Sequence, residues 1–338
     1  MTDIVPLDAC EPRHVGTVGG KAVGLGLLLR ENLQVPRGFA LGAHCYREFV
    51  NQTGIAAHID GLLAGADSLE QQAEASRRIR LLFEERELAP GLRQDLARAY
   101  RGLGSDIAVA VRSSATHEDS ARASFAGAHE SYLAVTGEAA ISRAVLLCWA
   151  GLFTPHALAY FRRVNIPATQ AAMGVVVQAM VFAEAAGVML TVDPVSGDRS
   201  QIAIEGSVGL GAAVVSGQVS PDRYFVDKVT LEIRSRVISD KHIAYRFDAR
   251  LSEVHSVAVP AQERRAPCLT DPEVVEIAAL GRLVERVLGA PQDIEWAIER
   301  RSPETRDVFL LQTRPQTASA ARKQQTTLQS GLYEEGYR

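Results

Sequence analysis

A cation and three hydroxyl groups follow one another closely within this 338-residue chain. The apolar, β-branched run Ile107–Val111 predicts a short buried strand. Such a strand would deliver four polar side chains together at its C-terminal end, namely Arg112, Ser113, Ser114 and Thr116. A guanidinium group forks phosphate oxygens and hydroxyl groups donate hydrogen bonds to them, so the stretch is suited to an oxyanion. A solvated loop after a core strand explains the same residues, and the stretch alone leaves both interpretations open.

A second cation, Lys21, stands near the start of a predicted glycine-rich helix, Val18–Arg30. The free amides and the dipole of a helix N-terminus favour an anion there. The segment is not a Walker A loop, because Val15 stands where that loop has its first glycine and Ala22 stands where it has Ser or Thr. A surface lysine on a capped helix is the alternative interpretation.

A β-hairpin is predicted near the C-terminus by two segments that alternate polar and apolar residues. The segments are Asp293–Glu299 and Val308–Arg314. Side chains alternate faces along a strand, and cross-strand neighbours face the same way. If Glu295 pairs with Gln312, Asp293 falls opposite Arg314 and the four groups share one face. A register slipped by one residue would put them on opposite faces.

This hairpin face would combine two carboxylates, one amide oxygen and one guanidinium group. Carboxylate and amide oxygens hold Mg²⁺ beside phosphates, while an arginine neutralises developing negative charge. A solvent-exposed hairpin face with an ordinary salt bridge is the alternative, and it stays open on the hairpin alone.

The length of the chain favours two domains or one large unit with two lobes. A net charge of -4 without a strongly basic block gives no sign of a nucleic-acid or anionic-membrane partner. The four cysteines are far apart and form no CxxC motif, which favours a reduced, cytoplasmic protein. The N-terminus does not have the pattern of a signal peptide. The most apolar window, Met173–Leu190, contains Gln178 and Glu184, so two buried strands are expected there rather than a membrane span.

The remaining patterns predict the elements that must position these residues. Helices are predicted at Ala43–Asn51, Leu69–Glu87, Leu92–Tyr100, Glu138–Trp149, Pro155–Val164 and from the capping box at Thr270 to Gly289. Strands are predicted at Glu130–Val135, Gly174–Met180, Gly187–Val192 and Ile202–Glu205, with a further hairpin formed by Arg223–Asp227 and Val229–Arg234. The glycine-rich stretch Gly206–Gly217 indicates unusual backbone angles or close approach of a ligand. Ser239–Arg265 is polar and unpatterned, and a surface excursion is expected there.

Six motifs, in this order along the chain, resemble those of one family. They are Gly19–Leu25, Val111–Thr116 with Ser124–Gly127, Gly187–Pro194, Gly209–Gly211 with Val215–Gly217, Asp293–Trp296 and Leu311–Pro315. The chain thereby resembles the ATP-binding portion of the dikinase-type phosphotransferases. That family includes phosphoenolpyruvate synthase, pyruvate phosphate dikinase, rifamycin phosphotransferase and the ATP-binding subunit of phenylphosphate synthase.

The resemblance implies an α/β (α+β) fold of the ATP-grasp type, with ATP and Mg²⁺ held in the cleft between two lobes. The lobes are expected at residues 1–192 and 193–317, followed by a polar tail at 318–338. Catalytic roles are implied for Lys21, Arg112 and Arg314, and metal contacts for Asp293, Glu295 and Gln312. The ATP contacts that the resemblance implies are Lys21, Arg112, Ser124, Gly127, Ser131, Gln178, Met180, Glu295, Gln312 and Arg314.

The chain departs from the family pattern in several ways. Ala212 stands where relatives commonly have Glu, and Asp193 stands where many have Asn. The family's histidine-bearing swivel domain, with its Gly-Gly-x-x-x-His motif, is absent, because the only Gly-Gly is Gly19-Gly20. The acceptor-binding domain is absent too. Partner domains or subunits of both kinds are therefore expected, and no nucleic-acid or membrane partner.

The implied activity is cleavage of ATP to AMP and Pi, with phosphate passing through a histidine on a partner to an acceptor such as phenol. A separate subunit resembling that of phenylphosphate synthase is the first expectation, supported by the start at Met1 and the polar tail. The excised ATP domain of a phosphoenolpyruvate synthase or rifamycin phosphotransferase is the alternative. A non-catalytic nucleotide-binding regulator is a third hypothesis, of another class.

Overall fold

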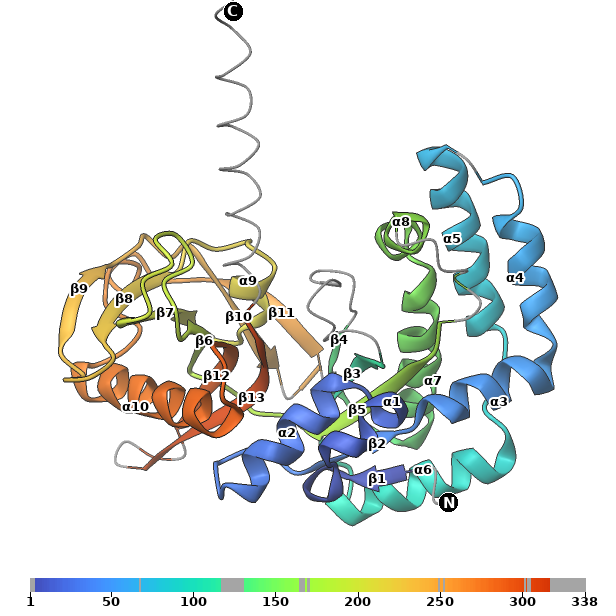
Figure 1. Cartoon of the computed structure of the whole chain (residues 1–338), viewed down its shortest axis with the longest axis horizontal. Helices are drawn as coiled ribbons and strands as arrows, with labels where there is room; N and C mark the ends of the chain where they lie inside the picture. Colours follow the sequence, from blue (N-terminus) through green and yellow to red (C-terminus); the bar gives the residue numbers. More distant parts are fainter. Residues whose placement is uncertain are drawn as a thin grey trace, which may run out of the picture. The chain divides into compact units, whose positions relative to one another are not determined.

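The computed structural model describes residues 4–66, 68–116, 131–163, 168, 171–248, 250–251, 253–300, 302 and 305–316. These residues belong to two compact units (Figure 1). Unit 1 comprises the residues up to Val181 together with Phe247–Val254. Unit 2 comprises Phe182–Arg246 and the residues from His255 onward. The fold is a mixed α+β fold, in which every strand pairing given for the two sheets below is antiparallel.

Unit 1 is built on a five-stranded sheet with the strand order β1-β2-β5-β3-β4. Its strands are β1 (Ile4–Pro6), β2 (Gly38–Leu41), β3 (Val109–Ala115), β4 (Ser131–Val135) and β5 (Met173–Ala179). The α-helices that belong to it are α1 (Val15–Val18), α2 (Gly20–Arg30), α3 (Ala43–Thr53), α4 (Ile55–Leu63), α5 (Leu69–Glu84), α6 (Pro90–Leu103), α7 (Glu138–Ala150) and α8 (Pro155–Arg163). The 3-10 helices are η1 (Leu7–Ala9), η2 (Pro12–His14) and η3 (Gly151–Phe153).

The core of unit 1 lies between the sheet and the helices α3 to α8. Val109 and Val111 of β3 and Val175 and Val177 of β5 belong to this core together with residues of these helices. The aromatic ring of Trp149 packs 5.3 Å from that of Phe49 and 5.8 Å from that of Tyr46, measured between ring centroids. The hydrophobic core thus takes one side chain in two from the central strands and leaves the alternate side chains for the opposite face.

The predicted strand before Arg112 is longer than expected. The sequence predicts a strand over Ile107–Val111 that ends before the polar residues, whereas β3 runs from Val109 to Ala115. The reason is its neighbour β5, which pairs with β3 along its whole length, from Val109↔Ala179 to Ala115↔Met173. The polar residues therefore alternate between the two faces of the sheet and do not gather at one strand end.

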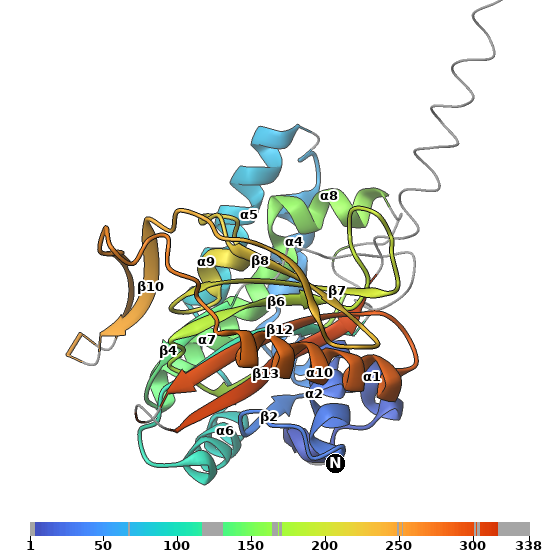
Figure 2. The same cartoon turned by 90° about the vertical axis from the view of Figure 1, so that its left-hand side faces the viewer.

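Unit 2 is built on a six-stranded sheet with the order β13-β12-β6-β7-β8-β9. Strands β13, β12, β6, β7 and β8 of this sheet are labelled in Figure 2. Its strands are β6 (Ala185–Leu190), β7 (Gln201–Val208), β8 (Asp222–Asp227), β9 (Ile233–Val237), β12 (Gln292–Arg300) and β13 (Arg306–Pro315). Helix α9 (Ala212–Val215) contacts β6 and β7, and α10 (Asp271–Leu288) packs along the sheet. A separate two-stranded sheet consists of β10 (Ile243–Asp248) and β11 (Glu253–Ala258), and its residues belong to unit 2 except for Phe247–Val254, which belong to unit 1.

Glycines allow close packing on one face of the unit 2 sheet, both against helix α10 and between strands. A Cβ atom at Gly281 of α10 would lie 2.6 Å from the sulfur of Met189 on β6. A Cβ atom at Gly206 of β7 would lie 2.8 Å from the ring of Trp296 on β12. Met189 and Trp296 are both fully buried. These side chains define the α10 face of the sheet, and the residues that alternate with them lie on the opposite face.

Two expectations about unit 2 need correction or refinement. The stretch Ser239–Arg265 is not unpatterned, because it contains the hairpin of β10 and β11. The two strands expected within Met173–Leu190 are present as β5 and β6, but they lie in the sheets of different units. The capping box at the start of α10 is confirmed, since the Thr270 amide and hydroxyl donate to the Glu273 carboxylate at 2.7 and 2.8 Å.

Within the described residues, no single helix is long and apolar enough to cross a membrane. Only the bent pair Glu138–Phe153 and Pro155–Arg162, with an angle of 44°, passes on length and composition. Trp149 and Phe153 of that pair belong to the hydrophobic core of unit 1.

Candidate functional site

The N-terminus of α2 is docked directly on β3 in unit 1. Gly19 has a φ angle of +84°, and a Cβ atom at this position would collide with the carbonyl oxygen and Oγ of Ser114. The Ala22 amide donates to Ser114 Oγ at 3.4 Å, which satisfies one of the free amides in the first turn of the helix. The glycine is therefore required both for its backbone angle and for the close approach.

This docking brings two of the predicted phosphate-binding cations to one part of unit 1. Lys21 is the second residue of α2 and is half-buried. Arg112, also half-buried, precedes Ser114 by two residues on β3 and shares its face of the sheet. Ser131 on β4 pairs directly with Arg112, so its side chain lies on that same face. The structure thus places Arg112 and Ser131 on the face of the sheet on which the N-terminus of α2 docks, and Lys21 lies in the first turn of that helix.

The three hydroxyl groups near Arg112 differ in their environments. Ser114 is fully buried and its Oγ accepts the amide of Ala22. The Thr116 hydroxyl donates to the Ala172 carbonyl at 3.2 Å. Ser113 Oγ is buried on the core face and has no hydrogen-bond partner among the described residues. The prediction that these hydroxyl groups lie together at the end of the strand is therefore wrong, because Ser113 and Ser114 lie within β3 and the Ser113 side chain is on the other face.

Two of the implied ATP contacts, Gln178 and Met180, lie at the end of β5 and directly after it. Gln178 is 2% exposed, and its amide nitrogen donates to the Pro36 carbonyl at 3.3 Å. Met180 follows the strand, is half-buried, and its backbone amide donates to the Ala108 carbonyl at 3.0 Å. The side chain of Gln178 thus holds the segment before β2 by a hydrogen bond. The backbone of Met180 extends the pairing of β5 to the segment before β3.

In unit 2 the hairpin of β12 and β13 has the register in which the four polar groups share one face. Asp293 pairs with Arg314, and Glu295 pairs with Gln312. The Arg314 guanidinium binds one oxygen of Asp293 with both Nε, at 3.0 Å, and a terminal nitrogen, at 2.8 Å. A bulge follows at once, because Trp296 pairs with Leu310 and Leu311 is left over. The predicted hairpin is confirmed, and the bulge is a feature that the alternation did not reveal.

The electrostatics of this face favour an additional cation. Burial raises the pKa of Asp293, the charge and hydrogen bonds of Arg314 lower it, and the charge of Glu295 raises it, with a net upward direction. Gln312 is 7% exposed, and its Oε1 is buried with no hydrogen-bond partner among the residues that the structure describes. A buried amide oxygen without a donor costs free energy, which a cation or a donating ligand would recover. A penalised carboxylate and an unpartnered oxygen thus lie on the same face.

The set of oxygen donors is small. Among the described residues, no group of three or more His, Cys, Asp and Glu side chains lies close enough to hold a metal ion. The hairpin face has two carboxylates and one amide, a set suited to Mg²⁺, which keeps several waters and binds to one or two carboxylates plus substrate phosphates. The donor set therefore fits Mg²⁺ bound together with a phosphate ligand.

Other sequence predictions fall elsewhere. Ser124 and Gly127 lie outside the described residues. Gly209 has a φ angle of +84° and packs against the backbone of Tyr245, while the next amide, that of Leu210, donates to the Tyr245 carbonyl at 2.9 Å. Ala212 begins α9 and is exposed. Gly217 also has a positive φ angle, of +69°, so the stretch has unusual backbone angles, which is one of the two alternatives that its composition left open.

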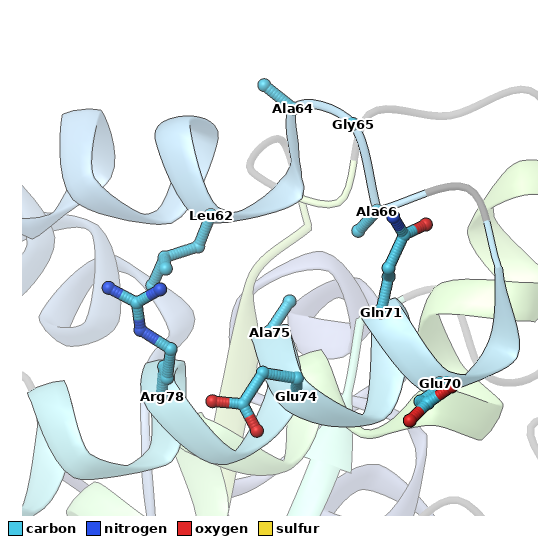
Figure 3. A pocket seen from close by; sticks show the side chains of 9 residues that line it. All are labelled: Leu62, Ala64, Gly65, Ala66, Glu70, Gln71, Glu74, Ala75 and Arg78. Atoms are coloured by element: carbon cyan, nitrogen blue, oxygen red, sulfur yellow. The ribbon is translucent and has the colours of Figure 1, made fainter.

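A surface pocket of about 370 Å³ lies between α4 and α5 in unit 1 (Figure 3). None of the predicted site residues lines it. The lining residues are Leu62, Ala64, Gly65, Ala66, Glu70, Gln71, Glu74, Ala75 and Arg78.

Comparison with known proteins gives consistent matches along nearly the whole chain. Residues 15–332 match the family model described as pyruvate phosphate dikinase, AMP/ATP-binding domain. A phosphoenolpyruvate synthase of Aeropyrum pernix is 38% identical over 353 residues, covering 95% of this chain and 43% of that protein. A probable phosphoenolpyruvate synthase of Methanocaldococcus jannaschii is 39% identical and covers 94% and 27% respectively. A rifampicin phosphotransferase of Streptomyces sviceus is 39% identical and covers 93% and 36%. The chain thus spans less than half the length of these relatives.

Proposed function

Because this chain belongs to the pyruvate phosphate dikinase AMP/ATP-binding domain family, we propose that it binds ATP with Mg²⁺ and performs the ATP-cleaving half of a dikinase-type phosphotransfer. The hairpin of β12 and β13 carries this proposal. Its face combines the Asp293–Arg314 ion pair with Glu295 and with the unpartnered buried oxygen of Gln312. Such a face has both a reason to bind a cation and an arginine for the phosphates beside it.

The proposed roles divide between the two units. In unit 1, Lys21 and Arg112 bind phosphate oxygens at the start of α2, with Ser131 beside Arg112. In unit 2, Asp293, Glu295 and Gln312 hold Mg²⁺, and Arg314 binds phosphate. We propose that the nucleotide is held as in the ATP-grasp fold, with contributions from both units. When bound, Mg²⁺ would neutralise phosphate charge that develops during transfer.

The proposed reaction requires no covalent chemistry from this chain. An imidazole nitrogen of a histidine on a separate domain or subunit bonds to the β-phosphorus of ATP, and the bond between the α- and β-phosphates breaks to release AMP. Water then cleaves the bond to the γ-phosphate, which leaves as Pi, and phosphohistidine remains for the final acceptor. Positioning and charge neutralisation account for most of the catalysis in phosphoryl transfer, so the cations and carboxylates of this chain are sufficient for its part.

The identity of the acceptor is not part of the ATP half-reaction. The related proteins named above are phosphoenolpyruvate synthases and rifampicin phosphotransferases, whose names point to different products. The chain matches under half the length of these proteins, so the histidine and the acceptor-binding region are proposed to lie outside the segment described here.

The direct test incubates the chain with ATP labelled at the α-phosphate and Mg²⁺, with and without histidine-bearing domains of the related enzymes. AMP is expected only when the histidine domain is present, together with acid-labile phosphohistidine on that domain. Arg112→Ala should lower the rate of AMP formation by about 100- to 1,000-fold, as does loss of a group that stabilises transition-state charge.

Arg98→Ala is the matched control, since Arg98 is exposed and forms an ion pair with the exposed Asp95 on α6 of the same unit. It should leave the rate within about twofold of the wild type, as expected for an exposed pair. Absence of AMP with every histidine domain, despite ATP binding, would overturn the catalytic proposal. Full activity of Arg112→Ala would overturn the assignment of the site.

A further inference from the structure

A chain of buried polar groups lies on the α10 face of the unit 2 sheet, directly behind the polar face of the hairpin. The Thr313 hydroxyl donates to the Gln292 side-chain oxygen at 2.8 Å. The backbone amide of Gln292 donates to Thr191 Oγ1 at 2.8 Å, and the backbone amide of Thr191 donates to the backbone carbonyl of Gln292 at 2.9 Å. Thr191, Gln292 and Thr313 are 0%, 1% and 5% exposed. The three residues, here called the Thr-Gln-Thr network, join the end of β6 to β12 and β13.

The members of this network are immediate chain neighbours of the proposed magnesium and phosphate ligands. Gln292 precedes Asp293, and Thr313 lies between Gln312 and Arg314. Because side chains alternate along a strand, each network residue points to the α10 face while its neighbours point to the opposite face. When the network side chains lie on the α10 face of the sheet, Asp293, Gln312 and Arg314 must therefore lie on the opposite face.

The register of β12 and β13 requires an additional interaction, such as this network, at this end of the hairpin. The bulge at Leu311 interrupts the ladder, so the pairing of Trp296 with Leu310 does not by itself determine how Gln312 and the residues after it pair with β12. A slip by one residue would turn Thr313 to the other face and bring Gln312 and Arg314 into the core. In the slipped register the buried Gln292 side-chain oxygen would lose its donor, which is costly in the interior.

We propose that Gln292 and Thr313 are positioning residues that hold the hairpin in the register required for binding Mg²⁺ and ATP. This inference rests on the function proposed above. Neither residue touches the ligands in this proposal; both act through Asp293, Gln312 and Arg314. Loss of the Thr313 hydroxyl should therefore weaken binding that depends on Mg²⁺ by more than its effect on stability predicts.

The test measures the affinity of the whole chain for ATP by calorimetry, with and without Mg²⁺, and its thermal unfolding. Thr313→Val keeps the shape of the side chain and removes the donor. It should weaken binding of ATP in Mg²⁺ by about tenfold or more, as is common when a residue that orients a metal ligand is changed. Thr313→Ser retains the hydroxyl and should bind as the wild type does.

Ile294→Val is the matched control, because Ile294 pairs with Thr313 across the strands, is fully buried and makes no side-chain hydrogen bond. It should lower the unfolding temperature while keeping the affinity of the wild type. The double variant Gln292→Met with Thr313→Val replaces both partners by apolar groups of similar size, which restores stability without restoring the network. If affinity returns together with stability in the double variant, or if Thr313→Val binds ATP as Ile294→Val does, the proposal is wrong.

Failure of the positioning role is distinguishable from failure of the proposed function. If the wild-type chain binds no ATP in Mg²⁺, the proposed function itself fails. If the wild type binds ATP and all variants bind equally, only the positioning role fails.

Discussion

At the scale of single residues, the proposed site depends on side chains that hold in place the elements carrying Lys21 and Arg112, the proposed phosphate-binding cations. Ser114 is the clearest case, since its hydroxyl accepts the Ala22 amide and its backbone is in contact with Gly19. Both contacts fix the first turn of α2, which carries Lys21, against the strand that carries Arg112. A hydroxyl that bonds to a helix amide acts as an N-cap does, although here it comes from a distant strand.

Ser114→Ala is therefore expected to destabilise unit 1 by about 1 kcal/mol, the usual value for a lost cap or neutral hydrogen bond, and to weaken ATP binding. The free energy of unfolding from urea titration and the ATP affinity measure the two effects. Ser113→Ala is the matched control, because Ser113 Oγ is buried without a partner among the described residues. Its removal should leave both quantities unchanged or raise stability slightly. Equal effects of the two substitutions would contradict the role given to Ser114.

Asp293 is a carboxylate whose surroundings disfavour its ionised form in the absence of a bound cation. Burial raises its pKa above the ordinary 3.8, and Arg314 lowers it without cancelling the effect. When the pKa of a carboxyl group is higher in the folded than in the unfolded state, the folded protein loses stability as the pH rises from the unfolded-state pKa through the folded-state pKa. At neutral pH the ionised Asp293 is therefore destabilising, and a bound cation would remove this penalty.

Asp293→Asn imitates the protonated form, so the variant should be at least as stable as the wild type at pH 7. The difference should vanish below pH 3.8, where the wild-type carboxyl is protonated as well. Its affinity for ATP in Mg²⁺ should nevertheless fall about tenfold or more, by analogy with other changes around a metal ligand. Urea unfolding at both pH values and calorimetry measure these effects. A variant that is less stable at pH 7 and binds ATP normally would contradict both assignments.

At the scale of elements, the hairpin of β12 and β13 is fixed at both ends by the helix side of its sheet. The Thr-Gln-Thr network holds the end that carries the proposed ligands. At the other end, Glu273 in the first turn of α10 is 4% exposed and forms ion pairs with Arg300 and Arg306, each at 3.4 Å. Because a buried carboxylate requires such partners, α10 and the hairpin are connected where the strands turn.

The hairpin and α10 could be predicted from the sequence because local patterns determine them. Asp293–Trp296 alternates polar and apolar residues, and Thr270 with Glu273 forms a capping box whose hydrogen bonds are purely local. The alternation also predicted that Asp293 and Glu295 share one face, and one of the two registers considered, with Glu295 opposite Gln312, is the one observed. Local pattern did not reveal the bulge at Leu311, since an extra residue in one strand is determined by the pairing of both strands.

The extent of β3 could not be predicted from its own residues. Its polar second half is a strand because β5 pairs with it and because Ser114 is satisfied by α2, which is 92 residues away in the sequence. Sheet partners and distant hydrogen bonds override local propensity in this way. The hairpin of β10 and β11 was missed for a related reason: both strands are mostly half-exposed or exposed, so they lack the apolar run that indicates a buried strand.

At the scale of the whole molecule, the proposed ligands are divided between two compact units that each have their own sheet. Lys21 and Arg112 belong to unit 1, whereas the four hairpin residues belong to unit 2. A nucleotide that binds groups from both units would couple their stabilities, since a ligand stabilises every part of the structure that its binding requires. Hydrogen exchange can measure this coupling, because it reports the opening of each region separately.

Saturating ATP in Mg²⁺ should therefore slow amide exchange both in α2 and β3 and in β12 and β13. Ligand at 100 times its dissociation constant adds about 2.7 kcal/mol to the stability of the bound form, which is enough to be visible in both units. Arg112→Ala changes only unit 1, yet it should reduce protection in the β12–β13 hairpin as well, because weaker binding removes the ligand from both units. Arg98→Ala should retain full protection in both, since Arg98 is exposed and forms an ion pair with an exposed residue. Protection confined to one unit, or hairpin protection in Arg112→Ala equal to that in the wild type, would show that the two groups of residues do not hold the same nucleotide.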